Sequence, residues 1–330
     1  MKKYLKILSI FTLLFFNMKV IGQGSTGWNN FILTTFTDLH YHVIWNEETN
    51  EGHIDDSGGQ WGYGPGNPND PNTGNRKTFM TYNINKRNYG SNGTLIKNSA
   101  ALFCAVQEVF FWNDKQYDKL KNNSNLEGKY FMVLPLIRFG IAILYHKGKF
   151  GDPINVVTNR IWIADCNPIK GDQWRGYIIC EFGTLIFACT HLGGSGSDKA
   201  DLIDLMLNEN IIKNSAKPIY IAGDMNFDPI NHPTLYNKFL AKGFEVMNSL
   251  EGAWKKDSNG NFVLDDNGNK IWVYDPAHQT TYDSKKMIDL IFKKASNYEV
   301  IEKGIPSETP STDLYSDHKP YRVRVDFVSP

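Results

Sequence analysis

The chain has 330 residues, of which 41% are hydrophobic and 21% are charged, and its 35 basic residues balance 35 acidic ones. This composition is typical of a folded globular protein, and it excludes a disordered, collagen-like or coiled-coil chain. Because the formal net charge is zero, overall charge does not indicate a polyanionic partner, and a site for such a partner must be local.

The first residues have the layout of a secretory signal peptide. Lysines precede the apolar run Ile7–Phe16, and small residues follow it, with an expected cleavage after Gly22. The run is too short to anchor the chain in a bilayer, and no cysteine lies near the cleavage point to carry a lipid. The sequence therefore predicts a signal peptide over residues 1–22 and a secreted protein, either extracellular or periplasmic.

Residues 23–76 differ in composition from the rest of the chain. They contain HIDDSGGQWGYGPGNPNDPNTGN, which is rich in Gly, Asn, Asp and Pro. Such a run is typical of loops and linkers rather than of a packed core. We therefore expect an irregular N-terminal extension over residues 23–76 and a folded domain over residues 77–328.

Short apolar runs recur from Thr78 onward and predict strands. Helical patterns fall between some of them, most clearly in SDKADLIDLMLNENIIK and HPTLYNKFLAK. Two Asn-Gly turns, in DSNGN and DDNGN, predict a small β insertion before residue 287. Mixed strands and helices in one segment indicate a single α/β or α+β domain of layered sheets. The strand-like runs are 78–84, 102–107, 131–136, 139–145, 176–182, 184–190, 218–222, 287–292 and 321–327.

Polar side chains stand at the ends of these apolar runs, where strands at one edge of a sheet can direct them into one pocket. An oxygen-rich set of this kind suits a hard cation such as Mg²⁺, and the shortage of His and Cys argues against structural zinc. In GDMN, Gly223 is expected to let the backbone turn sharply. The residues are Asn83, Gln107, Glu108, Thr190, His191, Asp224, Asn226, Asp289, Asp317 and His318.

Each of these motifs is weak evidence alone, because an SDH or THL tripeptide occurs by chance in many proteins. Their order along the chain is specific: N, QE, THL, GDMN, ID and SDH, each beside its own apolar run. This ordered set resembles the endonuclease/exonuclease/phosphatase superfamily, whose best-known branch is DNase I, over residues 77–328. The resemblance implies a four-layer sandwich of two mixed β-sheets packed face to face with helices outside, and a metal-dependent phosphoester hydrolase.

The resemblance also implies roles for individual residues. Asn83, Glu108 and Asp317 would hold Mg²⁺, for which Mn²⁺ is expected to substitute. The catalytic group around the phosphate would be His191, Asp224, Asn226, Asp289 and His318.

Elementary chemistry supports these roles. A phosphodiester is anionic, so attack on it requires charge neutralisation, which a cation on Glu108 can supply. The attacking water needs a base, for which the sequence leaves open either Asp224 or the His318–Asp289 pair.

Two arginines are weaker candidates for binding substrate phosphate. Arg138 precedes GIAILY and Arg175 opens RGYIICEF, so both enter the predicted sheets beside the site residues. A guanidinium suits phosphate oxygens, and the spacing resembles the nuclease subunit of bacterial distending toxins in the same superfamily. The alternative is that both are surface arginines at strand starts.

The first function hypothesis is a secreted endonuclease that hydrolyses extracellular DNA. The second is a phospholipase C or sphingomyelinase of the same fold, which would reach a membrane through aromatic residues of the insertion, Trp254, Trp272 and Tyr274. A phosphatase for small phosphoesters is a further alternative. A non-catalytic binding module is disfavoured, since no metal or histidine position is missing. We expect a monomer without an obligate protein partner.

The four cysteines are too few for a disulfide scaffold. Cys104 and Cys189 lie in apolar runs, where buried free thiols are expected. Cys166 and Cys180 could form a disulfide, and the sequence leaves their pairing open.

Overall fold

A computed structural model of the chain describes residues 76–110, 114–134, 139–162, 174–265, 268–294 and 298–327. They belong to the second of two compact units of the chain, Trp61–Pro330. The predicted signal peptide and nearly all of the predicted extension lie outside the described residues. Within the described part, the strands form two six-stranded sheets and a two-stranded hairpin.

The first sheet, sheet A, has the strand order β13-β14-β1-β2-β4-β3. Strands β1 and β2 are parallel, and the other pairs are antiparallel. Its strands are β1 (Arg76–Asn83), β2 (Phe103–Phe110), β3 (Glu127–Leu134), β4 (Phe139–Tyr145), β13 (Tyr298–Gly304) and β14 (Tyr321–Phe327).

The second sheet, sheet B, has the strand order β5-β6-β7-β8-β12-β9. Here β7 and β8 are the parallel pair, and the others are antiparallel. Its strands are β5 (Asn155–Trp162), β6 (Trp174–Glu181), β7 (Ile186–His191), β8 (Ile219–Asp224), β9 (Glu245–Val246) and β12 (Asp289–Lys294).

Aromatic side chains fill the space between the two sheets. Phe79 of sheet A stacks on Tyr220 of sheet B with ring centroids 3.9 Å apart, and both residues are fully buried. Phe103 and Phe187 continue this contact at 5.1 Å. Because large rings from both sheets interleave here, the sheets pack face to face.

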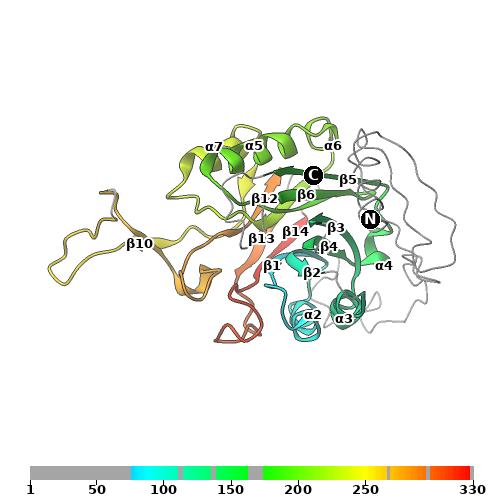
Figure 1. The fold of residues 1–330 in the computed structure, drawn as a ribbon, viewed down its shortest axis with the longest axis horizontal. Coiled ribbons are helices and arrows are strands. Elements are labelled where there is room, and N and C mark those ends of the chain that lie inside the picture. The colour runs from blue at the N-terminus through cyan, green and yellow to red at the C-terminus, as the bar shows by residue number, and fades with distance from the viewer. Residues whose placement is uncertain are drawn as a thin grey trace, which may run out of the picture. The chain divides into compact units, whose positions relative to one another are not determined.

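Helices cover the outer face of each sheet (Figure 1). Apolar residues of α2 and α3 pack on sheet A, and those of α5, α6 and α7 pack on sheet B. Ser195 and Asp198 form a capping box at the start of α5, which satisfies backbone donors that a helix leaves open. The helices are α2 (Tyr89–Asn98), α3 (Asp114–Ser124), α4 (Lys147–Phe150), α5 (Gly196–Leu207), α6 (Asn210–Lys213), α7 (Pro233–Leu240) and the short 3-10 helix η3 (Pro276–His278).

The four-layer sandwich predicted from the resemblance is thus confirmed. The predicted β insertion is also confirmed: β10 (Gly252–Trp254) pairs with β11 (Trp272–Tyr274), and one isolated bridge flanks each of the two Asn-Gly turns. We call residues 252–274 the arm, and Figure 1 shows it projecting away from both sheets. None of the described helices is long and apolar enough to span a membrane.

The reason that the sequence suggested for a glycine at position 223 is wrong. Gly223 does not make a sharp turn; it lies within β8, beside Thr190 of β7. A Cβ at position 223 would overlap the carbonyl group of Thr190. Gly223 is therefore required by the close approach of two strands rather than by an unusual backbone angle.

The described cysteines, Cys104, Cys180 and Cys189, are buried free thiols. Burial raises the pKa of all three thiols. Cys166 lies outside the described residues.

Candidate active site

One row of sheet B carries three of the predicted catalytic residues. Backbone pairing places His191, at the end of β7, beside Asp224, at the end of β8, and places Asp224 beside Asp289, the first residue of β12. The residues that alternate with them along these strands pack under the helices. Side chains alternate between the faces of a sheet, so these three point to the inner face, where sheet A lies.

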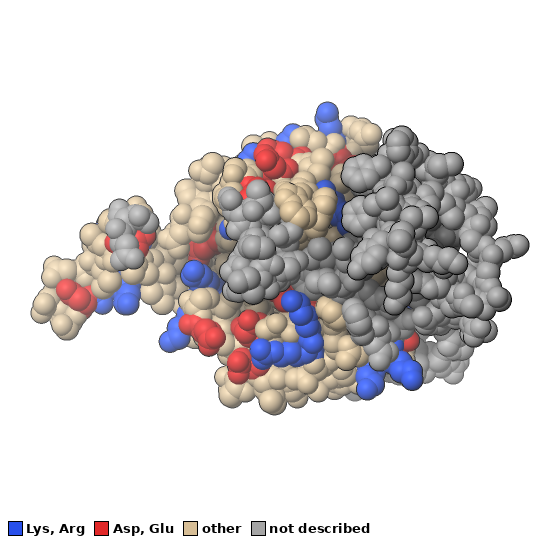
Figure 2. Space-filling view, in the orientation of Figure 1, with Lys and Arg blue, Asp and Glu red and all other residues tan. Residues whose placement is uncertain are grey.

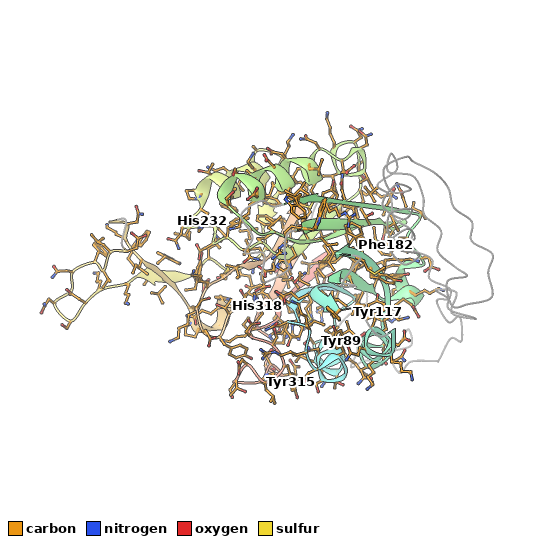
Figure 3. All side chains as sticks on the ribbon, in the orientation of Figure 1. Tyr89, Tyr117, Phe182, His232, Tyr315 and His318 are labelled. Atoms are coloured by element: carbon orange, nitrogen blue, oxygen red, sulfur yellow. The ribbon has the colours of Figure 1, made fainter. Side chains whose placement is uncertain are left out.

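His318 completes this cluster from the loop before β14. Its Nδ1 lies 2.8 Å from Asp289 Oδ2, and its Nε2 lies 3.9 Å from Asp224 Oδ2. One ligand atom from each of these three residues lies within 4.8 Å of the other two. In Figure 3, His318 lies on the opposite side of the sandwich from Phe182, which follows the far end of β6.

Burial and the neighbouring charges shift the pKa values of this cluster. Burial raises the pKa of Asp224, and the charge of Asp289 adds to that effect, so that the pKa reaches about 7. Burial lowers the pKa of His318, but the charge and hydrogen bond of Asp289 outweigh it and raise the pKa to about 10. At neutral pH, a cationic imidazole therefore lies beside a carboxyl group that can gain or lose a proton.

His191 and Asn226 flank Asp224 on its other sides. His191 Nε2 lies 3.5 Å from Asp224 Oδ2. Burial, followed by the charge of Arg175, holds the pKa of His191 well below its usual range, so the ring is neutral. The backbone N–H of Asn226 donates to Asp224 Oδ1 at 2.9 Å, and its Nδ2 donates to the Leu192 carbonyl at 2.8 Å.

Asn83, at the end of β1, links the two sheets across the site. Its Nδ2 donates to Asp224 Oδ2 at 3.0 Å and to Glu108 Oε1 at 3.2 Å. Its Oδ1 accepts the backbone N–H of Asn85 at 3.0 Å. The amide nitrogen therefore faces both carboxylates, whereas the oxygen predicted to bind metal is engaged by the backbone. Metal ligation by Asn83 stays a prediction.

Glu108 lies at an irregularity in β2. The register of β2 against β4 shifts between Val106 and Val109, and the φ of Glu108 is 55°. A left-handed φ in a residue other than glycine costs about 1–3 kcal/mol, and bulges beside active sites redirect side chains. The backbone N–H of Lys86 donates to the Glu108 carbonyl at 3.0 Å. The bulge thus brings the Glu108 carboxylate to Asn83.

Asp317 lies in the loop before β14, directly after Ser316. The hydroxyl of Ser316 donates to the Asn83 carbonyl at 2.6 Å, which fixes the loop before β14 against the end of β1. Asp317 is half-buried, and its charge contributes to the raised pKa of His318. Its predicted role as a metal ligand is compatible with this position.

The structure describes one of the two arginines that were predicted to bind phosphate. Arg175 is buried at the start of β6, and its guanidinium lies against Gly193, where a Cβ would come within 2.5 Å of Arg175 Nε. Its charge helps to lower the pKa of His191, and its contact with substrate phosphate stays a prediction. Arg138 lies outside the described residues.

Sequence reasoning missed the residues that hold the predicted catalytic side chains in place. Thr280 Oγ1 accepts the backbone N–H of Asp289 at 3.2 Å, and Asn248 Nδ2 donates to the Asp289 carbonyl at 3.0 Å. Lys86 was also missed, although its Nζ lies 3.9 Å from Glu108 Oε2. Ser316 could have been noticed because it precedes Asp317 directly, but Thr280 and Asn248 carry no strand-end signal.

The donor set fits a hard divalent cation. Glu108 is a partly exposed carboxylate, and Asp224 and Asp289 are two buried carboxylates that share one imidazolium. These carboxylates gather negative charge in a largely buried cluster, which a divalent cation would help to neutralise. Carboxylate oxygens are the ligands that Mg²⁺ and Mn²⁺ prefer.

Solved structures with the same fold come from several sources. The chain is similar to an endonuclease/exonuclease/phosphatase family protein from Bacteroides thetaiotaomicron, with 17% identity, a TM-score of 0.55, and coverage of 77% of this chain and 98% of that one. It is also similar to a mannosyl-6-phosphatase from the same organism, with 17% identity, a TM-score of 0.52, and coverage of 76% and 100%. The human Nocturnin catalytic domain with bound sulfate gives 16% identity, a TM-score of 0.52, and coverage of 77% and 94%. At these identities the likeness concerns the fold alone.

Sequence comparison gives the family directly. No curated protein sequence matches the chain. A model of the Endonuclease/Exonuclease/phosphatase family, however, matches residues 80–318, which begin in β1 and end at His318. This match covers well over half of the chain and all of the strand ends that form the site, and the chain belongs to the Endonuclease/Exonuclease/phosphatase family, a family of phosphoester hydrolases.

Proposed function

We propose that the protein is a secreted, Mg²⁺-dependent phosphodiesterase that hydrolyses nucleic acid, with extracellular DNA as its first candidate substrate. The observation that carries this proposal is the convergence of His191, Asp224, Asp289 and His318 with Asn83 and Glu108 at one edge of both sheets. Hydrolysis of a phosphoester requires a group that accepts a proton from water, cationic groups around the phosphate and a site for a metal cation. This cluster has candidate residues for each.

Asp224 is best placed to accept a proton from the attacking water. Its pKa of about 7 lies near neutral pH, where a general base works most effectively. His318 holds its proton at that pH, because Asp289 raises its pKa. His318 would therefore stabilise the negative charge that grows on the phosphate oxygens, rather than act as the first base.

Asp289 positions His318 through the 2.8 Å contact with Nδ1, which leaves Nε2 to face the substrate. Asn226 and neutral His191 stand on the other side of Asp224 and would donate to the non-bridging oxygens of the phosphate. A neutral imidazole at position 191 avoids a second buried cation beside His318.

Glu108 and Asp317 would hold the divalent cation, with Asn83 orienting Glu108. When bound, Mg²⁺ would supply charge neutralisation to the phosphate and to the leaving oxygen. Mn²⁺ has similar ligand preferences and is expected to replace it.

A substrate panel tests the proposed activity. Purified protein with Mg²⁺ would be offered plasmid DNA, RNA, sphingomyelin vesicles, inositol phosphates and mannose 6-phosphate, with Glu108→Gln as an inactive control from the same preparation. We expect nucleic acid to be cleaved by the wild type only. Release of phosphocholine, or of phosphate from a small ester, without cleavage of nucleic acid would move the protein to one of the other substrate classes.

Secretion is the second part of the proposal and rests on the lysine-flanked apolar run before Gly22. We expect the protein in the periplasm or the culture medium, with its N-terminus shortly after Gly22. N-terminal mass spectrometry of the native protein measures this directly, and an intact Met1 in all of the protein would contradict export by cleavage.

A further inference from the structure

The row that carries the catalytic residues continues beyond them to the edge of sheet B. Backbone pairing places Gly176 beside His191, and Arg160 beside Gly176. Neighbouring strands lie about 4.8 Å apart, so Arg160 stands about 10 Å from His191 in the same row. Position 176 has no side chain, and a Cβ there would come within 3.0 Å of the buried ring of Phe131. The Phe131 ring of sheet A therefore lies against Gly176, the position between Arg160 and His191 in this row.

A pair of tryptophans stands one step beyond this row, at the same edge as the catalytic residues. Trp162 ends β5 and Trp174 begins β6, and they are direct partners in the backbone pairing. Their rings meet edge to face, with centroids 5.2 Å apart and an interplanar angle of 80°. Trp162 is 51% exposed although it is a large apolar residue.

Alternation along the strands places both tryptophans on the inner face. Val157 and Ile161 of β5 pack toward the helices of sheet B, so Trp162 and Arg160 point the other way. The guanidinium of Arg160 lies 4.7 Å above the ring of Trp174, and its Nη1 donates to the carbonyl of Val133 in β3. A cation and two indole rings therefore share the face and the edge of the catalytic cluster.

We infer that Trp162 and Trp174, with Arg160, form a subsite that stacks on nucleobases of a single-stranded nucleic acid while its phosphate occupies the catalytic cluster. This inference rests on the proposed function. Stacked nucleotides of one strand are about 3.4 Å apart, so the 10 Å between Arg160 and His191 spans only a few nucleotides. Every base offers a π-face to an indole ring, and arginine adds attraction for phosphates and bases. The bases of a duplex are already stacked, so the subsite favours a single strand.

The structural alternative is that Trp162 and Trp174 only stabilise the pairing of β5 with β6, as cross-strand aromatic pairs do. The chain offers a matched control for this alternative. Trp254 and Trp272 of the arm are also direct cross-strand partners, with ring centroids 5.0 Å apart and an interplanar angle of 82°. Trp254 is exposed, at 39%, and it lies outside the catalytic row.

The test compares cleavage of two labelled oligonucleotides of equal length, one of ordinary single-stranded DNA and one in which the flanking nucleotides are abasic. For Trp162→Ala and Trp174→Ala we expect kcat/KM on the ordinary strand to fall about ten- to a hundredfold. On the abasic strand the same variants should stay within about twofold of wild type, because the stacking partner is already missing. Trp162→Phe should recover most of the loss, and Trp254→Ala should cleave both strands like the wild type. A single-stranded RNA of the same sequence, assayed in parallel, distinguishes DNA from RNA as the source of the nucleobases.

Equal losses on the ordinary and abasic strands, or no loss on either, would overturn the inference. So would a loss of binding to sphingomyelin vesicles in the tryptophan variants with unchanged binding of nucleic acid. If the wild type cleaves neither strand, the proposed function fails, and the subsite is then judged by binding alone. Quenching of tryptophan fluorescence by the ordinary strand in EDTA, abolished in Trp162→Ala, would still support the subsite, and absence of quenching in the wild type would refute it.

Discussion

The contact between His318 and Asp289 is the most constrained interaction of the candidate site. Asp289 is fully buried, and its Oδ2 lies 2.8 Å from His318 Nδ1. Thr280 and Asn248 fix the backbone of Asp289 on both sides. A carboxylate that is buried in this way is costly without a charged partner, so the two residues are expected to function as a unit.

The dyad gives the first prediction. His318→Ala should lower kcat by about 10²–10³-fold while the protein stays folded, because the charge stabilisation at Nε2 is lost. Asp289→Asn should cost less, since the ring remains. In the double variant the loss should be well below the product of the two single losses. Steady-state kinetics on a cleaved oligonucleotide, with circular dichroism to confirm folding, decide the matter; multiplicative losses would mean that the residues act independently.

The second prediction concerns cation binding by Glu108. This residue has a strained φ of 55°, and its carboxylate accepts a hydrogen bond from Asn83. Ligands that bind only the folded state raise its melting temperature. We expect Mg²⁺ to raise the Tm of the wild type, and we expect Glu108→Gln to lose most of this rise while its Tm in EDTA stays near that of the wild type. Differential scanning calorimetry in EDTA and in Mg²⁺ measures both. An unchanged Mg²⁺ response in Glu108→Gln would remove Glu108 from the cation site.

The acids and histidines of the site could be found from the sequence because each one ends or begins an apolar run. Their supports could not be found in this way. Ser316 bonds to the carbonyl of Asn83, and Thr280 accepts from the backbone of Asp289; neither contact leaves a local pattern, because both depend on how the sheets pack. The bulge at Glu108 is likewise invisible in the sequence, since nothing in AVQEV marks an extra residue.

At the scale of elements, the parallel pair β7 and β8 positions two of the predicted catalytic residues, and Gly223 sets how closely these strands approach. The third prediction is that Gly223→Ala destabilises the protein by about 1–3 kcal/mol, as overpacking of a tight contact does. In a domain of this size that lowers Tm by about 2–4 °C per kcal/mol, and activity should fall as His191 and Asp224 separate.

Gly183 provides the matched control for this substitution, because a Cβ at that position meets nothing within 4 Å. Gly183→Ala should therefore keep the wild-type Tm and activity. Thermal melts of the two variants side by side are sufficient. A Gly223→Ala protein as stable and active as Gly183→Ala would show that β7 and β8 can move apart without cost.

Central strands were predicted well and peripheral elements were missed, for a physical reason. Strands buried on both faces, such as β7 and β8, are continuous apolar runs. The edge strand β5 reads NVVTNRIW and is only half-buried, so its pattern is ambiguous. Helix α2 contains Gly93, which weakens helix propensity; there it admits the backbone of α3 at Leu120. Such tertiary contacts decide an element that local propensity disfavours.

At the scale of the whole chain, the net charge does not indicate a polyanionic partner. On the described part of the face in Figure 2, basic and acidic side chains are interspersed, in agreement with the zero formal net charge of the chain. On the proposed function, recognition of an anionic substrate would come from the local site, through the imidazolium of His318 and a bound cation. Long-range attraction is not expected to contribute much.

The arm gives the fourth prediction. Trp272 and Tyr274 pack on the core of sheet B, but the part between Trp254 and Trp272 bonds mainly to itself. Replacing residues 255–271 by Asn-Gly should keep β10 and β11 paired and leave Tm within a few degrees of the wild type. We expect cleavage of nucleic acid to be unchanged. Vesicle flotation and nuclease assays of this variant check both, and loss of a lipid-directed activity on shortening would favour the phospholipase alternative.

The central claim is that one site, built from the strand ends of both sheets, hydrolyses phosphodiesters with a divalent cation. The most direct measurement follows a labelled single-stranded oligonucleotide with wild type, Glu108→Gln and His318→Ala, each in EDTA and in Mg²⁺. We predict rapid cleavage only by the wild type in Mg²⁺, none by any protein in EDTA, and severe loss in both variants. Full cleavage in excess EDTA, or wild-type rates in Glu108→Gln and His318→Ala, would contradict the account.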